Sequence, residues 1–310
     1  MRDYPYPMAN GNANPTYAIA EGLFGVLEHM AEHLTDLENK GRALTANYQH
    51  LDEQISLATQ IQRALLPHES VASTGAELRT VYRPVDRVSG DIYDIVRLDE
   101  TRLGISLADA TGHGVGAALL TVFIKRIFQG KEIENGSYRI VPPDEILRRL
   151  NRELHGMRLR QCPYVTALHA VYDESQRRLT FARGGMPLPV YVPVGGTPRQ
   201  IGSGGPLVGA FADSRFETVE MNLAPGDRIL FFTDGLSALL CGRNPQAPSH
   251  DLTQIPSFAE ALRLPIDSFL THIHKLIDHT PSSAWHGDDI TLIALDVTSG
   301  GGLTSPGLLT

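Results

Sequence analysis

The chain is poor in cysteine and contains no long apolar run. Its 310 residues include two cysteines, Cys162 and Cys241, which lie far apart and form no CxxC spacing. Neither a disulfide framework nor a zinc site is therefore predicted. No apolar run reaches the roughly 18 to 20 residues that span a bilayer, and no basic flank followed by an apolar signal core begins the chain. We expect a cytoplasmic protein without a membrane partner.

The chain also lacks an excess of positive charge. Its formal net charge is -8, which argues against nucleic acid as the main partner and leaves acidic metal sites or protein partners open. Hydrophobic residues make up 42% of the sequence, enough for a chain of this length to bury a full core. The composition therefore predicts a soluble globular protein with one large domain and an appendage, or two small domains.

The first part of the chain has two patterns. Residues 1–16 are rich in Pro, Asn and Gly, and we expect them to be disordered. Residues 17–66 follow steps of four and three, which predicts a long helix that forms a coiled coil and ends before Pro67. A long amphipathic helix packed on its own domain is the alternative. The seam positions are Leu23, Leu27, Met30, Leu34, Leu37, Gly41, Leu44, Tyr48, Leu51, Ile55, Ala58, Gln62 and Leu65.

Residues 67–298 have the pattern of a domain with grouped strands and helices. Nine short segments are rich in β-branched and aromatic residues, and helical patterns cover residues 114–129, 143–157 and 257–279. Because the helices do not alternate regularly with the strands, an α+β domain with helices covering packed antiparallel sheets is predicted. Residues 241–256 are expected to form an exposed loop, and residues 299–310 a disordered tail.

Four acidic motifs stand at the ends of strand-like runs. They read VSGDIYD (88–94), SLADATGHG (106–114), ILFFTDGL (229–236) and GDDITLIAL (287–295), and they contribute Asp91, Asp109, Asp234 and Asp288 or Asp289. Carboxylates at the ends of apolar strands are costly to bury unless a cation or hydrogen-bond donors compensate them. Clustered Asp oxygens select Mg²⁺ or Mn²⁺, and two such ions about 3.5 to 4 Å apart can activate a water for attack on a phosphoryl group.

The spacing of these motifs predicts only part of the site. The 18-residue separation of Asp91 and Asp109 suits two adjacent antiparallel strands joined by a turn near Asp99 and Glu100. Asp234 and Asp288 could join them only through long-range folding, and each also fits an ordinary turn. Two further side chains have two interpretations. His113 is a proton donor or a structural histidine, and Arg87 is a phosphate ligand or a surface arginine.

Taken in order, the motifs resemble those of the metal-dependent serine/threonine protein phosphatases, the PPM or PP2C-like family. The resemblance is to its bacterial SpoIIE/RsbU-like branch, which acts in stress-response and sporulation signalling. It runs from about Ser56 to Val297 and includes IQRALLP (61–67), FARGGMPLPV (181–190) and GGPLVGAF (204–211) beside the acidic motifs. It implies an αββα sandwich that holds two Mn²⁺ or Mg²⁺ ions at one end of the paired sheets.

The resemblance also implies roles for individual residues. Asp91 and Asp109 would hold the pair of ions, with Asp109 as a bridge and the carbonyl of Ala110 as a further ligand. Asp234 and Asp288 would complete the shell of the second ion, and Asp289 would support the ligands. These carboxylates would be catalytic through the water that the ions activate, which attacks phosphoserine or phosphothreonine without a covalent enzyme intermediate. Asp94 would orient the loop.

The chain departs from the family pattern at a few positions. Met186 stands where a histidine is usual, which puts any role of that histidine in doubt. None of the expected metal carboxylates is missing. The smaller departures are Ser89 for Gly, Ala110 and Thr111 for Val-Ser, and Gly116 for Pro, while Gly90 stands where eukaryotic members have Glu.

The predicted function is a protein serine/threonine phosphatase that acts on a phosphorylated STAS-type anti-sigma-factor antagonist. The coiled coil would join two copies into a homodimer and would transmit a signal from an upstream regulator that binds it. One alternative is a PPM-like module that binds a phosphoprotein without hydrolysing it, which the intact carboxylates disfavour. Another is a metal-dependent nuclease, which the net charge of -8 and the absence of a basic stripe disfavour.

Overall fold

The computed structural model describes residues 15–67, 71, 73–110, 112, 114–134, 136–157, 164–202, 204–241, 251–281 and 287–300. The predictions for residues 1–14, His113 and residues 301–310 lie outside these ranges. Contacts within the chain divide it into two compact units, Met1–Gln54 and Ile55–Thr310. The boundary falls inside a helix, so the last turns of that helix belong to the second unit.

The predicted long helix is present as α1 (Pro15–Leu65). In its first unit the apolar seam is exposed to solvent, with Leu34 and Leu37 each more than half exposed. The helix surface carries an ion pair of 2.7 Å between Asp36 and Lys40, which are four residues apart. Among the described helices, none has both the length and the apolar character required to cross a bilayer.

The second unit contains two five-stranded antiparallel sheets. The first has the order β1-β12-β11-β8-β9, with strands β1 (Ala76–Arg83), β8 (Val190–Val192), β9 (Arg199–Gln200), β11 (Arg228–Phe232) and β12 (Ile290–Val297). The second has the order β10-β7-β6-β3-β2, with strands β2 (Asp91–Arg97), β3 (Arg102–Ala110), β6 (Val165–Asp173), β7 (Arg178–Gly184) and β10 (Thr218–Asn222). All nine predicted strands are present.

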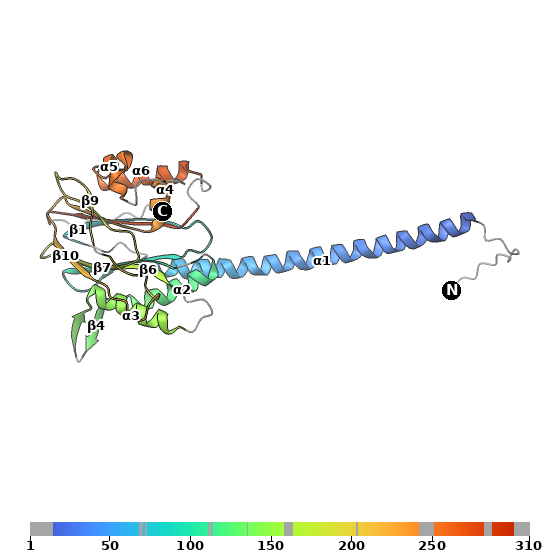
Figure 1. Ribbon diagram of the computed structural model, residues 1–310, viewed down its shortest axis with the longest axis horizontal. Helices are drawn as coiled ribbons and strands as arrows, with labels where there is room; N and C mark the ends of the chain where they lie inside the picture. Colours follow the sequence, from blue (N-terminus) through green and yellow to red (C-terminus); the bar gives the residue numbers. More distant parts are fainter. Residues whose placement is uncertain are drawn as a thin grey trace. The chain divides into compact units, whose positions relative to one another are not determined.

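Three apolar layers hold the sheets and helices together (Figure 1). Between the sheets, Phe181 and Phe231 meet edge to face with ring centroids 6.4 Å apart. Helices α2 (Val115–Ile127) and α3 (Pro143–Gly156) cover the second sheet. Helices α4 (Asp234–Cys241), α5 (Pro256–Ala261) and α6 (Ile266–His279) cover the first. The predicted αββα sandwich is confirmed.

The structure differs from the sequence prediction in several local features, among them the two-residue strand β9, which was not expected. A hairpin of β4 (Lys131–Glu134) and β5 (Ser137–Ile140) was not expected, because its strands are short and mostly exposed. Helix α4 begins at Asp234, where an Asp-Gly turn was an open interpretation. The helix predicted over 257–279 is divided into α5 and α6, because Pro265 cannot continue a helix and directly precedes α6. The exposed loop expected over 241–256 is wrong in the part that the structure describes, because Cys241 ends α4, and Leu252 is buried in a short 3-10 turn, η1 (Leu252–Gln254), before α5; residues 242–250 lie outside the described residues.

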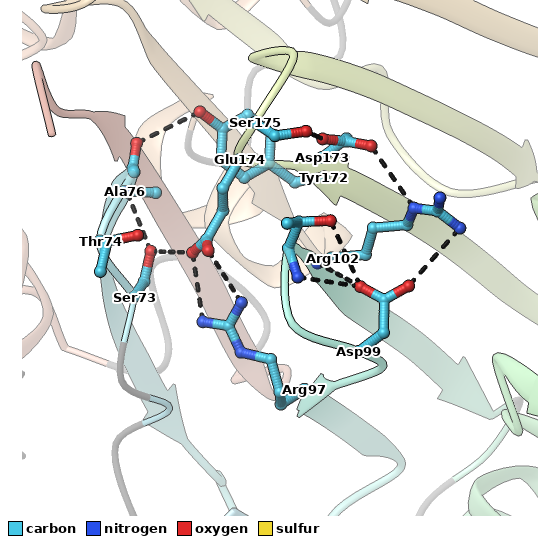
Figure 2. A network of polar contacts seen from close by, with 12 residues as sticks. Ser73, Thr74, Ala76, Arg97, Asp99, Arg102, Tyr172, Asp173, Glu174 and Ser175 are labelled. Carbon is cyan, nitrogen blue, oxygen red and sulfur yellow. Dashed lines mark hydrogen bonds and ion pairs between the residues drawn. The ribbon is translucent and has the colours of Figure 1, made fainter.

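A polar network fastens the two sheets where β2 turns into β3 (Figure 2). Glu174 is almost buried and accepts two hydrogen bonds from the Arg97 guanidinium, of 2.8 and 3.2 Å. Ser73, just before β1, donates a further hydrogen bond to Glu174. Because Ser73 leads into the first sheet and Arg97 ends β2 in the second, the carboxylate joins the two sheets.

Candidate metal centre

Asp91 and Asp109 lie opposite each other in the ladder between β2 and β3. Asp91 is the first residue of β2, and Asp109 is the second-to-last residue of β3, so both stand at the same end of the sheet. The predicted hairpin with its turn near Asp99 is confirmed. The Ala110 amide donates a 2.9 Å hydrogen bond to the Gly90 carbonyl, which closes the ladder at this end.

Asp91 is buried and receives two hydroxyl hydrogen bonds. Its exposed fraction is 1%, and its Oδ2 accepts from Thr233 Oγ1 at 2.9 Å and from Thr291 Oγ1 at 2.6 Å. Burial and the nearby Asp109 raise its pKa well above the ordinary value, although the two hydroxyl bonds oppose this. The first sheet therefore supplies donors to a carboxylate on the second.

The remaining carboxylates share one cleft of about 550 Å³ with Asp109 and Ala110. Asp234 enters it from the first turn of α4, and Asp288 and Asp289 enter from the segment before β12. Burial and the charges of Asp234, Asp288 and Asp289 raise the pKa of Asp109 to about 7. Burial and Asp288 raise the pKa of Asp234 as well. These side chains repel one another in the ionised state, which a cation between them would relieve.

Asp289 has a positioning role within this cleft. Its Oδ1 accepts a 2.8 Å hydrogen bond from the Val85 amide, and its Oδ2 accepts one of 2.7 Å from the Gly90 amide. Both bonds go to the segment between β1 and β2 that leads into Asp91. Asp289 therefore holds this segment against the residues that precede β12.

Two glycines allow the backbones around the site to approach closely. A Cβ on Gly235 would lie 2.1 Å from the Asp289 carbonyl oxygen, and one on Gly90 would lie 2.9 Å from the Ala110 carbonyl oxygen. A side chain at either position would push apart segments that carry the carboxylates. The glycine after Asp234 is thus required by packing against the segment before β12.

The donor set fits hard divalent cations. It consists of carboxylate oxygens and a backbone carbonyl, which Mg²⁺ and Mn²⁺ prefer. Within the described part of the chain, however, no three His, Cys, Asp or Glu side chains stand close enough together to hold a metal ion as they are placed, so the carboxylates share a cleft without forming a closed set of ligands. The site is therefore an open cleft with clustered carboxylates along its walls.

Three functional side chains were not identified from the sequence. Thr233 directly precedes Asp234 in FFTD, and Thr291 lies two residues after Asp289 in DDIT; this nearness to predicted ligands is the signal that the sequence offers for them. Gln62 is 3% exposed and holds the Ser89 backbone, accepting from its amide at 2.9 Å and donating to its carbonyl at 2.6 Å. The sequence signal for Gln62 is that it is a polar residue at a seam position of α1. Ser89 Oγ in turn accepts a 3.0 Å hydrogen bond from the Asp91 amide.

The other side chains considered from the sequence lie near the site without entering it. Asp94 forms a 3.1 Å ion pair with Lys125 of α2. Arg87 is exposed, and its amide donates to Asp86. Met186 is buried in the layer between the sheets.

The fold and these carboxylates define the class of the protein. Residues 99–298 match the family model "Stage II sporulation protein E (SpoIIE)". The SiaA-PP2C domain of Pseudomonas aeruginosa has the same fold, with a TM-score of 0.62 and 23% identity over 81% of this chain and 98% of that one. The chain therefore has the PP2C fold of metal-dependent serine/threonine phosphatases, and it belongs to the SpoIIE family.

Two curated relatives from Bacillus subtilis (strain 168) are named phosphoserine phosphatases. RsbP is 25% identical over 79% of this chain and 58% of its own length. RsbU is 26% identical over 61% of this chain and 55% of its own length. The chain thus spans somewhat more than half the length of the curated relatives it matches. The SpoIIE and PP2C proteins generally depend on Mn²⁺ or Mg²⁺.

Proposed function

We propose that the chain hydrolyses phosphoserine or phosphothreonine in a protein substrate, with two Mn²⁺ or Mg²⁺ ions in the cleft between Asp109 and Asp288. The observation that supports this is the convergence of Asp109, Ala110, Asp234 and Asp288 on one cleft, directly beside buried Asp91. The ions, when bound, would activate a water for attack on phosphorus.

The residues of the chain would have three roles at this cleft: to bind the ions, to orient Asp91 and to hold the segment that precedes Asp91. Asp91, Asp109, Asp234, Asp288 and the Ala110 carbonyl would provide the oxygen ligands. Thr233 and Thr291 hold Asp91 in one orientation through its Oδ2, and Asp289 holds the segment before Asp91. Such outer hydrogen bonds commonly change metal affinity 10- to 100-fold, roughly, when they are removed.

One assay tests the proposed activity. The full chain is incubated with p-nitrophenyl phosphate and with a phosphoserine peptide, in Mn²⁺, in Mg²⁺ or in EDTA. We expect release of phosphate that depends on the metal and is lost in EDTA. Phosphopeptide binding without any metal-dependent release, under all these conditions, would instead identify a non-catalytic binding module.

We further propose that the substrate is a phosphorylated STAS-type protein. Support comes from the two relatives named phosphoserine phosphatases RsbP and RsbU and from the SpoIIE family itself. The test is dephosphorylation of a purified phospho-STAS protein compared with an unrelated phosphoprotein. Equal kcat/KM for the two would contradict this substrate.

We also propose that α1 pairs with a copy of itself and controls the site. The exposed seam of the first unit supports pairing, because a stable helix of this length needs an apolar partner. The hydrogen bonds of Gln62 to Ser89, and of Asp91 to Ser89, support control. A regulator that changed the pairing of α1 would act on Asp91 through Ser89.

The full chain offers matched variants for this test. Leu34→Lys with Leu37→Lys places charges in the seam, and Asn39→Lys places one charge outside it. We expect the seam variant to become monomeric and to change turnover, and Asn39→Lys to behave as wild type, by light scattering and phosphatase assay. A seam variant that stays dimeric with unchanged turnover would contradict the proposal.

A further inference from the structure

A second pocket of about 540 Å³ adjoins the metal cleft. Asp234 lines both, so the two pockets share this carboxylate as part of their walls. The second pocket lies between α4 and the segment around Met186 that follows β7. If the phosphoserine of a protein substrate lies in the metal cleft, the residues on either side of it lie beside the cleft. The second pocket is next to that position.

One face of α4 forms a wall of the pocket. Asp234, Ser237, Ala238 and Cys241 all line it, and these positions are three, four and seven residues beyond the first, so they share one helix face. Seven residues of helix extend roughly 10 Å, the length of about three residues of extended chain. A substrate segment that follows this face from Asp234 would therefore place up to about three residues in the pocket.

Arg183 supplies a positive charge to the opposite wall. It follows Leu179 and Phe181 on the same face of β7, which points into the layer between the sheets. Its Nη1 donates a 2.6 Å hydrogen bond to the Met186 carbonyl, while its buried Nε has no partner among the described residues. Burial lowers the pKa of this guanidinium.

Arg183 differs from Arg228 and Arg97 in its ion-pair partners. Arg228 pairs with Asp296 at 2.6 Å, and Arg97 pairs with Glu174 at 2.8 Å. Arg183 has no carboxylate partner in the part of the chain that the structure describes. A half-buried guanidinium without a counterion is unfavourable, so an anion that enters the pocket would gain a charge-assisted, two-pronged partner.

We propose that this pocket binds the residues beside the phosphoserine of the protein substrate, and that Arg183 binds an acidic side chain two or three residues from it. The inference rests on the proposed phosphatase function and names the substrate feature that the same site recognises. Met186, Leu188 and Ala238 give the pocket apolar surface, which suits an apolar residue between the phosphoserine and the acidic one.

The experiment compares phosphoserine peptides in which a single Asp is moved through positions -3, -2, +2 and +3, each with an Asn partner peptide. For wild type in Mn²⁺ we expect one position where Asp raises kcat/KM about tenfold over Asn, the size of a charged hydrogen bond. Arg183→Gln should reduce this Asp/Asn ratio to about one. Each variant's peptide turnover is normalised to its own turnover of p-nitrophenyl phosphate, which is too short to reach the pocket.

Two further variants complete the test. Arg178→Gln removes an arginine from the same strand, where it pairs with Glu220 at 3.3 Å on the surface, and it should keep the wild-type ratio. Ala238→Leu narrows the pocket from the α4 side and leaves the charge of Arg183 unchanged. It should lower kcat/KM for the peptide relative to kcat/KM for p-nitrophenyl phosphate.

The outcomes separate this inference from the proposed function. If wild type hydrolyses p-nitrophenyl phosphate with Mn²⁺ but has no Asp preference at any position, the inference is wrong and the phosphatase function stands. If Arg183→Gln lowers p-nitrophenyl phosphate turnover as much as peptide turnover, Arg183 binds the phosphoryl group, and the assignment to an acidic side chain is wrong. If wild type has no metal-dependent turnover at all, the proposed phosphatase function is wrong, and the inference that rests on it is wrong as well.

Discussion

Thr291 Oγ1 donates a 2.6 Å hydrogen bond to Oδ2 of Asp91, although 200 positions separate the two residues in the chain. Thr291 stands in β12 of the first sheet, and Asp91 begins β2 of the second. The bond therefore joins the two layers of the sandwich beside the candidate metal cleft, orients the buried Asp91 carboxylate and opposes the rise of its pKa.

Replacing Thr291 by Val should weaken metal binding more than it weakens the fold. The substitution keeps the shape of the side chain but removes the hydroxyl donor, and we expect the Mn²⁺ concentration for half-maximal activity to rise about tenfold. Thr271→Val is the matched control, because its hydroxyl donates a 2.8 Å hydrogen bond to the Asp267 carbonyl on its own helix, away from the cleft. Metal titrations of activity would show the difference, and equal Mn²⁺ dependence in the two variants would contradict the role of Thr291.

Asp234→Asn should abolish most of the turnover while the protein stays folded. The amide removes a negative charge from the cleft, so we expect kcat to fall about a hundredfold or more at saturating Mn²⁺. Asp213→Asn changes an exposed aspartate in the loop before β10 and should leave kcat unchanged. Circular dichroism would establish that both variants are folded. An Asp234→Asn enzyme with near wild-type kcat would rule out this residue as a ligand.

In EDTA, the stability of the protein should decrease as the pH rises from about 4 through 7. The pKa of Asp109 is raised to about 7 in the folded state, so the folded protein holds this proton more tightly than the unfolded chain does. The resulting stabilisation is complete below the unfolded pKa and is lost as pH rises through the folded pKa. The raised pKa values of Asp91 and Asp234 act in the same direction.

Asp109→Asn should flatten that pH dependence, because the amide does not ionise. At pH 8 in EDTA we expect the variant to be more stable than wild type by on the order of 2 kcal/mol, or roughly 5 °C in Tm. Adding Mn²⁺ should raise the Tm of wild type more than that of the variant. Melting curves at pH 5 to 8 provide the measurement; a steeper decline with pH in the variant would contradict this account of Asp109.

Gly235→Ala should lower both stability and activity. The new Cβ would stand 2.1 Å from the Asp289 carbonyl oxygen, so α4 or the segment before β12 must move, at a cost of about 2 to 3 kcal/mol. Gly116→Ala is the control, because a Cβ there meets no atom within 4 Å, and alanine favours the helix by roughly 0.5 to 1 kcal/mol. Urea unfolding of both variants tests the prediction, which fails if the two have the same midpoint.

Arg97→Met should destabilise the protein without a direct effect on the metal cleft. Glu174, with its side chain 6% exposed, would lose its guanidinium partner, and an unpaired buried carboxylate costs about 3 kcal/mol. The double variant with Glu174→Gln should recover part of this loss. Urea unfolding measures the stability, and kcat at a temperature where the variant is folded should match wild type. A single variant as stable as wild type would show that the network in Figure 2 contributes little.

Much of the fold follows from local patterns in the sequence. The nine predicted strands all occur, since each alternates or runs apolar over a length typical of a strand. The pairing of Asp91 with Asp109 was also predictable, because a short turn joins neighbouring strands. The β4–β5 hairpin was missed because its side chains are exposed and carry no apolar period.

The sequence by itself determined the kinds of element, the seam of α1 and the supply of hard oxygen ligands, because these depend on residue type and short spacing. Only the tertiary structure decided which of these carboxylates share a cleft. Strand β12 lies between β1 and β11, which brings Asp288 and Thr291 beside residues some 200 positions earlier. The alternation of apolar and polar residues predicts which side of a strand is buried, but not which strands lie next to it in the sheet. Arg183 lacks a carboxylate partner among the described residues for the same reason, since long-range packing selects an arginine's partners.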